Sequence, residues 1–419
     1  MRTVRRIGKE EKRTQLEAVR DEAAWPAPVD ARVALIQALI PLGLSAVAEA
    51  LEAEVEQLAG VRYGRDDARP ELVRWGRQRG SVYVADQKVP MMVPRVRDRQ
   101  RGVEQTLSTY EQLQQPRHLD EGLFRRVLGG LACGEYAACA EAVPEAFGIS
   151  RSSVSRRFVR ASARRLQELQ ERSLAGEQWV ALLIDGKTFA ADELVIALGV
   201  TVRGEKRVLG LVQTATENGR VCAAFLRELV TRGFQASEGV LVVIDGAKGL
   251  RAAVNEVFGH QAQVQRCQWH KRENVVRHLP RTKQATWRSK LQRAYEHPTY
   301  TMARAALRRL EAELRLLNVS AAKSLAEGLE ETLTLHRLGL FTELGQSFKT
   351  TNALESIMAQ VEQRTAKVDH WRTSDQKQRW CAAALLLIEP RLRKVKGYRY
   401  LGRLAEALRS TKTHKRDAA

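Results

Sequence analysis

The sequence predicts an α/β core that follows an N-terminal region of helices with one β segment and precedes a long helical region. Three observations predict it: apolar runs of strand length between residues 178 and 270, helical periodicity between two of these runs, and an almost wholly helical, basic stretch after residue 271. The chain has 419 residues, of which 44% are hydrophobic. It therefore has room for about three folding units and a substantial core.

The charge balance favours a polyanionic partner. Lys and Arg number 69 against 49 Asp and Glu, a net charge of +20. On a long chain with a globular composition, this surplus favours nucleic acid over a membrane surface or simple solubility. The five cysteines are scattered without a C-x-x-C pair, which argues against a disulfide framework and fits a reducing cytoplasm.

The N-terminal end shows neither a targeting segment nor a membrane span. The charged opening lacks the apolar core of a signal peptide. The apolar stretch 33–48 is too short to cross a bilayer, and we interpret it as a buried helix. We therefore expect a soluble cytoplasmic protein without a membrane partner.

The first 115 residues combine charged helices with a strand-like segment at 81–94, whose prolines would confine it to a sheet edge. We assign region 1–115 to DNA end binding or dimerisation.

A helix-turn-helix is predicted within region 116–175. A helix over 135–147, a turn at 148–150 and a second helix from Arg151 fit the motif, with Val154 and Phe158 packing inward. Pro144 within the first helix departs from a clean motif, so an ordinary helical hairpin is the alternative. Small hydroxyl groups and guanidinium groups on the open face would contact DNA. These residues are Arg151, Ser152, Ser153, Ser155, Arg156 and Arg157.

Region 178–270 is predicted to form the strands of the core. Apolar runs at 180–184, 193–202 and 207–214 indicate a three-strand meander, and a helical stretch then leads to the run 239–244. A second helix at 247–258 leads to a short strand at 263–268. A right-handed crossover would place the fourth strand parallel to the first. Asp185 and Asp245, which follow these two strands, would then meet at the carboxyl edge of the sheet.

Each aspartate is followed by glycine, and one Asp-Gly pair alone is most often a turn. The same apolar-run-Asp-Gly unit occurs twice, one crossover apart, which favours a functional pair. Two neighbouring carboxylates repel each other unless divalent cations neutralise them, and Mg²⁺ prefers such oxygen ligands.

A third acidic residue follows far downstream. Asn352 and Glu355 open a predicted helix with an apolar stripe formed by Leu354, Ile357 and Val361. By itself, an Asn three residues before a Glu is also typical of a capping box.

Together, Asp185, Asp245, the segment Cys267-Gln-Trp-His270 and the Asn-x-x-Glu helix resemble the bacterial insertion-sequence transposases of the Mutator type. These are DDE transposases with a ribonuclease H-like catalytic domain. The resemblance implies that Asp185, Asp245 and Glu355 are the catalytic acids and the ligands of two Mg²⁺ ions, for which Mn²⁺ can substitute. It also implies a helical insertion over 271–345 and a catalytic helix within 346–390.

The resemblance further implies binding of double-stranded DNA at terminal inverted repeats, cleavage, and strand transfer into target DNA by a homodimer or higher oligomer in the bacterial nucleoid. Cys267, His270 and Asn352 are signature residues of the family. The C-x-x-H spacing alone suggests half of a zinc site, but without a second half we favour a structural or DNA-positioning role. In the segment after Glu355, the resemblance assigns the basic residues Arg364 and Lys367 to holding the flanking DNA.

Two alternative functions and the role of the C-terminal tail stay open. The chain could be a DNA-binding repressor or architectural protein with an inert core, or a junction-resolving nuclease on the same fold. The basic tail 391–419 is either a solvated terminus or a segment that contacts phosphates.

Overall fold

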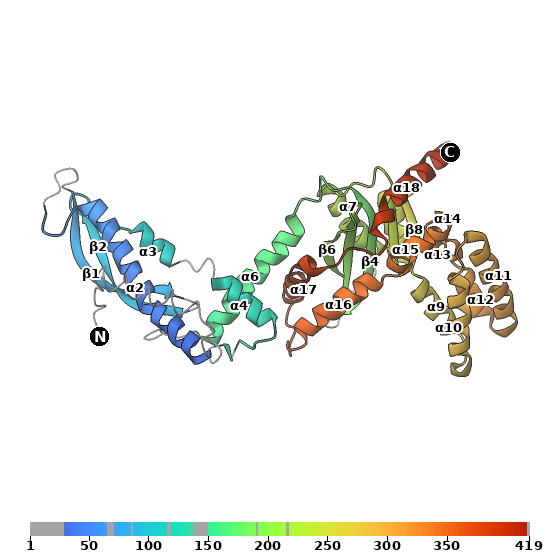
Figure 1. The fold of residues 1–419 in the computed structure, drawn as a ribbon, viewed down its shortest axis with the longest axis horizontal. Helices are drawn as coiled ribbons and strands as arrows, with labels where there is room; N and C mark the ends of the chain where they lie inside the picture. Colours follow the sequence, from blue (N-terminus) through green and yellow to red (C-terminus); the bar gives the residue numbers. More distant parts are fainter. Residues whose placement is uncertain are drawn as a thin grey trace. The chain divides into compact units, whose positions relative to one another are not determined.

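The computed structural model resolves two compact units, Met1–Ala161 and Ser162–Ala419, and the helix and strand labels below are those of Figure 1. The structure describes residues 29–64, 71–84, 87–114, 119–133, 135–136, 150–189, 192–214 and 218–416.

The first unit pairs a long helix with a small antiparallel sheet. Its elements are α2 (Val29–Ala59), β1 (Leu72–Val84), β2 (Gln87–Asp98), β3 (Val103–Gln105), α3 (Ser108–Leu113) and α4 (Leu119–Leu128). Strand β2 lies between β1 and β3, so the expected edge strand is the middle one. Its prolines still lack a second neighbour, because Pro90 and Pro94 pair with β1 only, and β3 pairs with β2 after residue 95.

Helix α6 (Arg151–Glu171) begins where the second helix of the predicted helix-turn-helix begins. Val154 and Phe158 are buried as expected, and the Phe158 ring stacks on Phe124 with centroids 5.7 Å apart. Arg157, which we expected on the open face, is buried beneath Tyr83, with its guanidinium 4.8 Å from the ring centroid. Residue 157 lies one turn after Val154, so it shares the inward side of the helix. Most of the predicted first helix, 137–147, lies outside the described residues.

The second unit is built on a five-stranded mixed sheet in the order β6-β5-β4-β7-β8. Its strands are β4 (Trp179–Phe189), β5 (Asp192–Thr201), β6 (Lys206–Thr214), β7 (Val240–Ile244) and β8 (Ala262–Arg266). The first three form the predicted antiparallel meander, and β7 and β8 add in parallel beyond β4. Strand β8 ends two residues earlier than expected, because Gln268 already belongs to the next helix.

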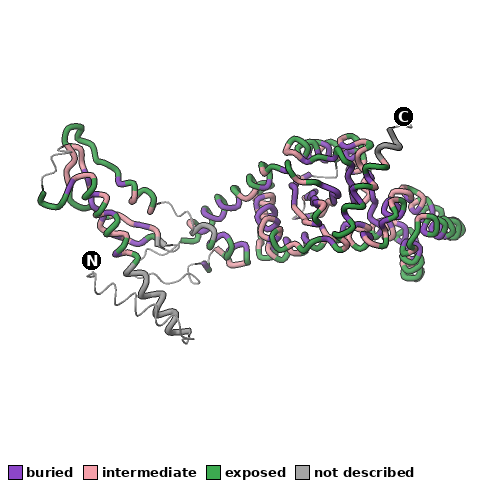
Figure 2. The backbone as a smooth tube through the Cα atoms, turned by 45° about the horizontal axis from the view of Figure 1, so that its top comes forward, coloured by how far each residue is buried: buried purple, intermediate pink, exposed green. Residues whose placement is uncertain are grey.

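Helices cover the sheet on both faces, as its continuously apolar strands require. Helices α7 (Gly219–Thr231) and α8 (Lys248–Phe258) pack into one core with alternate residues of β4 and β7, such as Leu182 and Val242. The intervening residues of these strands are also buried, since α16, α17 and α18 contact β4, β6 and β7. Figure 2 shows the strands as buried backbone within a shell of partly exposed helices.

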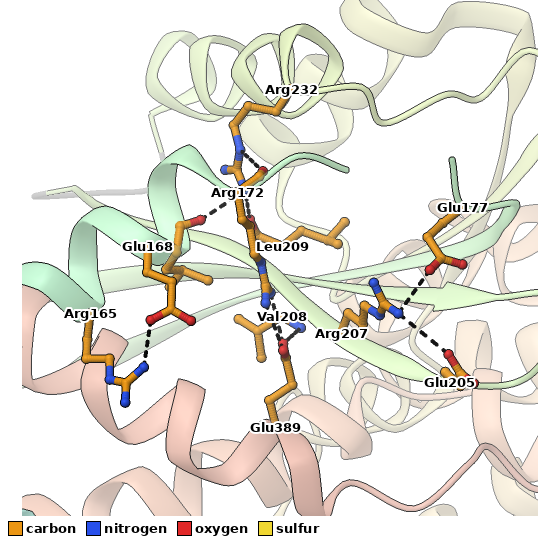
Figure 3. Close-up of polar contacts among 11 residues, drawn as sticks. Arg165, Glu168, Arg172, Glu177, Glu205, Arg207, Val208, Leu209, Arg232 and Glu389 are labelled. Carbon is orange, nitrogen blue, oxygen red and sulfur yellow. Dashed lines mark hydrogen bonds and ion pairs between the residues drawn. The ribbon is translucent and has the colours of Figure 1, made fainter. Parts of the chain in front are cut away.

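Charged side chains form hydrogen bonds with backbone groups of the edge strand β6. Its pairing with β5 shifts register at Leu209, which leaves backbone groups of this strand without ladder partners. The Glu389 carboxylate accepts a 2.6 Å hydrogen bond from the backbone N–H of Val208 and a two-pronged ion pair from Arg172 (Figure 3). The Arg232 guanidinium donates to the carbonyl of Leu209 at 2.8 Å.

The chain between β8 and residue 348 consists of helices joined by short turns. Its helices are α9 (Gln268–Val276), α10 (Arg281–Tyr295), α11 (Tyr300–Leu317), α12 (Val319–Ala326), α13 (Leu329–Thr332), α14 (Thr334–Arg337) and α15 (Phe341–Phe348). They enclose a hydrophobic core of their own that includes Trp287, Leu307 and Leu325. The buried Lys271 ammonium anchors this core by donating to the carbonyls of Ser324 and Glu327.

The chain then returns to the sheet through α16 (Asn352–Thr365), α17 (Ser374–Ile388) and α18 (Leu401–Arg416). The solvated-terminus interpretation of 391–419 is wrong for α18, because Leu401, Leu404 and Leu408 are buried and the helix contacts β4 and β7. Among the described residues, no helix is both long and apolar enough to cross a membrane.

Candidate functional site

Asp185 lies within β4 rather than at its end. The strand continues to Phe189 because residues 186–189 still pair with β5, and Asp185 lies opposite Ile196. On its other side β4 pairs in parallel with β7 through Ile184 and Ile244. An aspartate follows each of these two isoleucines, so Asp185 and Asp245 occupy neighbouring positions. Neighbouring strands of a sheet are spaced about 4.8 Å apart.

Asp245 begins the turn that leads from β7 into α8. Its carboxylate oxygen Oδ1 accepts a 2.9 Å hydrogen bond from the backbone N–H of Ala247. Gly246 follows with a φ of +105°, a backbone conformation that favours glycine. The Arg266 guanidinium donates to the Gly246 carbonyl at 2.9 Å and fills the space that a Cβ would need. Residue 246 is therefore restricted to glycine by both conformation and space.

Glu355 lies in the first turn of α16. The helix begins at Asn352 with Thr351 as its N-cap, and no side chain caps it, so the capping-box interpretation is wrong. The Glu355 carboxylate is thus available for another role. One face of α16 is tied to β4 by the ion pair between Lys187 and Glu362, with 3.0 Å between Nζ and Oε1. Both side chains are largely exposed, and Glu362 lies about two turns beyond Glu355, so this pair is a surface contact that contributes little to the site.

The structure brings Asp185 and Glu355 together with a third residue, His270. One ligand atom from each of the three lies within 4.8 Å of the other two. His270 Nε2 is 3.9 Å from Glu355 Oε1. All three residues are partly exposed, so the group is open to a ligand. Asp245 flanks this group through its position next to Asp185.

The electrostatics show that the acids repel one another. The pKa of Asp185 is raised from 3.8 to about 7, mainly by burial and also by the charges of Asp245 and Glu355, while the Thr351 hydroxyl opposes the rise. A carboxyl with such a pKa carries a proton for part of the time near neutrality. A divalent cation removes this conflict, because it neutralises the carboxylates without protonation.

Cys267 has a structural environment. Its thiol is buried, accepts from the backbone N–H groups of Trp269 and His270, and lies 3.9 Å from the Thr351 hydroxyl. Burial raises the pKa of this thiol. Its backbone N–H continues the sheet by donating to the carbonyl of Ile244 at 2.7 Å. Cys267 therefore fixes the start of α9, and among the described residues it belongs to no group that could hold a metal.

The predicted DNA contacts have mixed exposure. Arg151, Ser152, Ser155 and Arg156 are exposed at the start of α6, and Ser153 is partly exposed. Lys367 is exposed after α16, whereas Arg364 is partly buried and donates to the Gln360 carbonyl at 2.8 Å. Asn352 is exposed, and its backbone N–H donates to the Thr350 hydroxyl.

The sequence analysis did not predict the role of Thr351 or the position of His270 beside Glu355. Neither the spacing nor the type of these residues reveals which helix faces them.

The sequence is similar to those of several known proteins. The sequence pattern described as "Transposase, Mutator family" matches residues 12–386. The transposase for insertion sequence element IS6120 of Mycolicibacterium smegmatis is 30% identical over 200 residues, which span 46% of this chain and 60% of that protein. The transposase for ISRM5 of Rhizobium meliloti (strain 1021) is 26% identical over 327 residues, 76% of this chain and 79% of that protein.

The transposase for IS256 in transposon Tn4001 of Staphylococcus aureus is 27% identical over 229 residues, 51% of this chain and 56% of that protein. The aligned parts of the Mycolicibacterium and Staphylococcus proteins thus cover less than two thirds of their length, while the family pattern covers most of this chain. The chain belongs to the Mutator family of transposases.

Proposed function

We propose that this protein is a DDE transposase that binds the terminal inverted repeats of an insertion sequence and catalyses Mg²⁺-dependent cleavage and strand transfer of DNA. The observation that carries the proposal is that Asp185 and Glu355, which lie far apart in the sequence, bring carboxylate oxygens within 4.8 Å of each other. The strand order β6-β5-β4-β7-β8, with a meander followed by parallel strands, supports a ribonuclease H-like core.

The residues present fit divalent cations. Asp185, Asp245 and Glu355 offer oxygen ligands at one edge of the sheet, and the pKa of Asp185 is raised to about 7 by burial and by the two neighbouring charges. When bound, two Mg²⁺ ions, or Mn²⁺ in their place, would supply charge stabilisation for an in-line phosphoryl transfer. The three carboxylates would hold the two cations in position, and the Thr351 hydroxyl would orient Asp185.

The reaction itself transfers a phosphoryl group without a covalent enzyme intermediate. A water molecule, or later a DNA 3′-hydroxyl, forms a new P–O bond, and the P–O bond to the departing oxygen breaks. The exposed Arg151, Ser152, Ser155 and Arg156 of α6 would contact DNA, as would Lys367 beside the catalytic helix. A homodimer or higher oligomer would hold two element ends.

Nicking of DNA that carries the inverted repeats flanking this gene tests the proposal. Asp185→Asn and Glu355→Gln should bind this DNA yet lose Mg²⁺-dependent nicking and strand transfer. Glu362→Gln is the matched control, since it removes an exposed carboxylate from the same helix, and it should cut as the wild type does. Gel shift without any cutting by the wild-type protein would support a repressor instead, and cutting of branched DNA without end specificity would support a junction-resolving nuclease.

A further inference from the structure

His270 is the third member of the group formed by Asp185 and Glu355, and it is not one of the acids that define the proposed function. Its Nε2 lies 3.9 Å from Glu355 Oε1, beyond the reach of a hydrogen bond. Its Nδ1 is buried and, within the described part of the chain, has no hydrogen-bond partner. Neither ring nitrogen therefore makes a hydrogen bond that would account for the orientation of this imidazole.

His336, which is buried, shows the contrast with the partly exposed His270. His336 Nε2 lies 3.1 Å from the carbonyls of Tyr295 and His297, and its ring stacks on Phe341. His336 Nδ1 also lacks a hydrogen-bond partner, but the contacts of its Nε2 and its ring hold it in the way that a structural histidine is held. His270 contacts Trp269 edge to face, and its Nε2 side faces the acidic group.

The position of His270 is fixed by the backbone around it. Cys267 and Gln268, which precede it, donate through their backbone N–H groups to Ile244 and Lys349. The Gln268 side chain donates to the Thr332 carbonyl at 2.9 Å. The start of α9 is thus bonded to β7, to the loop before α16 and to the helical insertion, and this leaves little freedom for the His270 backbone.

The spacing of the group suits one small divalent ion. Ligand atoms that share an ion at about 2.1 Å lie about 3–4 Å apart, so side-chain movements of under about 1 Å would close Asp185, His270 and Glu355 around it. Imidazole nitrogen favours transition-metal ions, whereas Mg²⁺ prefers oxygen ligands and gains little from a nitrogen. A nitrogen ligand in this group would therefore change which ion it prefers.

We propose that His270 supplies a nitrogen ligand, together with Asp185 and Glu355, to one of the catalytic cations and raises the preference of that site for Mn²⁺ over Mg²⁺. The inference rests on the proposed function, because it takes the same acids to be cation ligands. It adds a residue that selects among cations and gives the C-x-x-H segment a role without zinc: Cys267 fixes the helix start, and His270 binds the ion.

The test uses the full-length, metal-free protein and Mn²⁺ as the probe. Pulsed electron paramagnetic resonance detects coupling between bound Mn²⁺ and a ¹⁴N nucleus, and titration with Mg²⁺ as competitor gives the affinity ratio. His270→Gln removes the nitrogen ligand, and His270→Asp replaces it with oxygen. His260→Gln is the matched control, because His260 precedes β8 and so lies at the opposite edge of the sheet, where it is exposed.

We expect ¹⁴N coupling in the wild type and in His260→Gln, and its loss in both His270 variants. The Mn²⁺ to Mg²⁺ affinity ratio should fall about tenfold or more in His270→Gln, a change equivalent to ~1.4 kcal/mol. His270→Asp should still bind Mn²⁺ but with a lower ratio than the wild type, which shows that the site is intact.

Coupling that persists in His270→Gln, or bound Mn²⁺ without coupling in the wild type, would overturn the inference about His270. In that case the loss of Mn²⁺ binding in Asp185→Asn would leave the proposed function standing. If instead Asp185→Asn binds Mn²⁺ as the wild type does, both the inference and the cation site of the proposed function fail.

Discussion

Replacing Asp185 with asparagine should stabilise the metal-free protein at neutral and alkaline pH while abolishing its activity. The pKa of this carboxyl is raised from 3.8 to about 7 by burial and by the charges of Asp245 and Glu355. Folding therefore favours the protonated form, whereas the unfolded chain loses the proton at a lower pH. Asp185→Asn keeps a similar shape and carries no charge, so it removes this penalty.

The sign and size follow from linkage. The wild-type protein binds more protons in the folded state between the two pKa values of Asp185, so its stability falls as pH rises from about 4 to about 7 and stays low above that. The full difference corresponds to on the order of 4 kcal/mol, because each pKa unit is worth about 1.4 kcal/mol. Between pH 5.5 and pH 8, the gain of Asp185→Asn over the wild type should grow by about 2 kcal/mol.

Urea unfolding at pH 5.5 and pH 8, without divalent ions and followed by circular dichroism, measures this gain. Adding Mg²⁺ at pH 8 should shrink it, because the ion binds the folded wild type. Glu362→Gln is the control, since it removes an exposed carboxylate of the same helix that lies outside the group of acids. An equal gain at both pH values, or none at pH 8, would refute the electrostatic account of the site.

Three other substitutions have defined outcomes. Gly246→Ala should lower stability by about 2 kcal/mol and reduce cleavage, because φ is +105° and the Arg266 side chain fills the space, and a normal urea midpoint would contradict this. Glu389→Ala should cost about 3 kcal/mol in urea unfolding, since it leaves Arg172 and the edge of β6 unpaired, and a loss below ~1 kcal/mol would show that solvent replaces the contact. Cys267→Ser should retain Mn²⁺ affinity measured by titration and lose only about 1 kcal/mol of stability, whereas lost Mn²⁺ binding would assign the thiol to the metal site.

Local pattern was sufficient to predict the sheet. The apolar runs and the crossover rule predicted that β4 and β7 lie side by side in parallel, as observed, and this brings Asp185 and Asp245 next to each other. The same pattern missed the extension of β4 to Phe189, because residues 186–188 are Gly-Lys-Thr and pair with β5 as a hairpin without an apolar alternation. Pairing by the backbone does not require an apolar side chain, so such a segment leaves no clear signal.

Contacts between distant segments could not be predicted. Arg157 has a charge and a helical position that suit an exposed face, yet the ring of Tyr83, from a strand far earlier in the chain, covers it. The C-x-x-H spacing suggested a zinc half-site, but His270 meets Glu355 because α16 returns to β4 after the whole insertion. Spacing along a chain reports neighbours on one element and carries no information about which later helix arrives beside it.

The helical insertion between β8 and α16 also sets an order during synthesis. A ribosome delivers Asp185 and Asp245 first and Glu355 only after the insertion has emerged, so a growing chain lacks a complete group of acids until Glu355 has been added. A gene copy interrupted by a frameshift within the insertion would encode the first unit and the sheet but never the last acid. Such a decayed copy would yield a protein able to fold in part and unable to assemble the group.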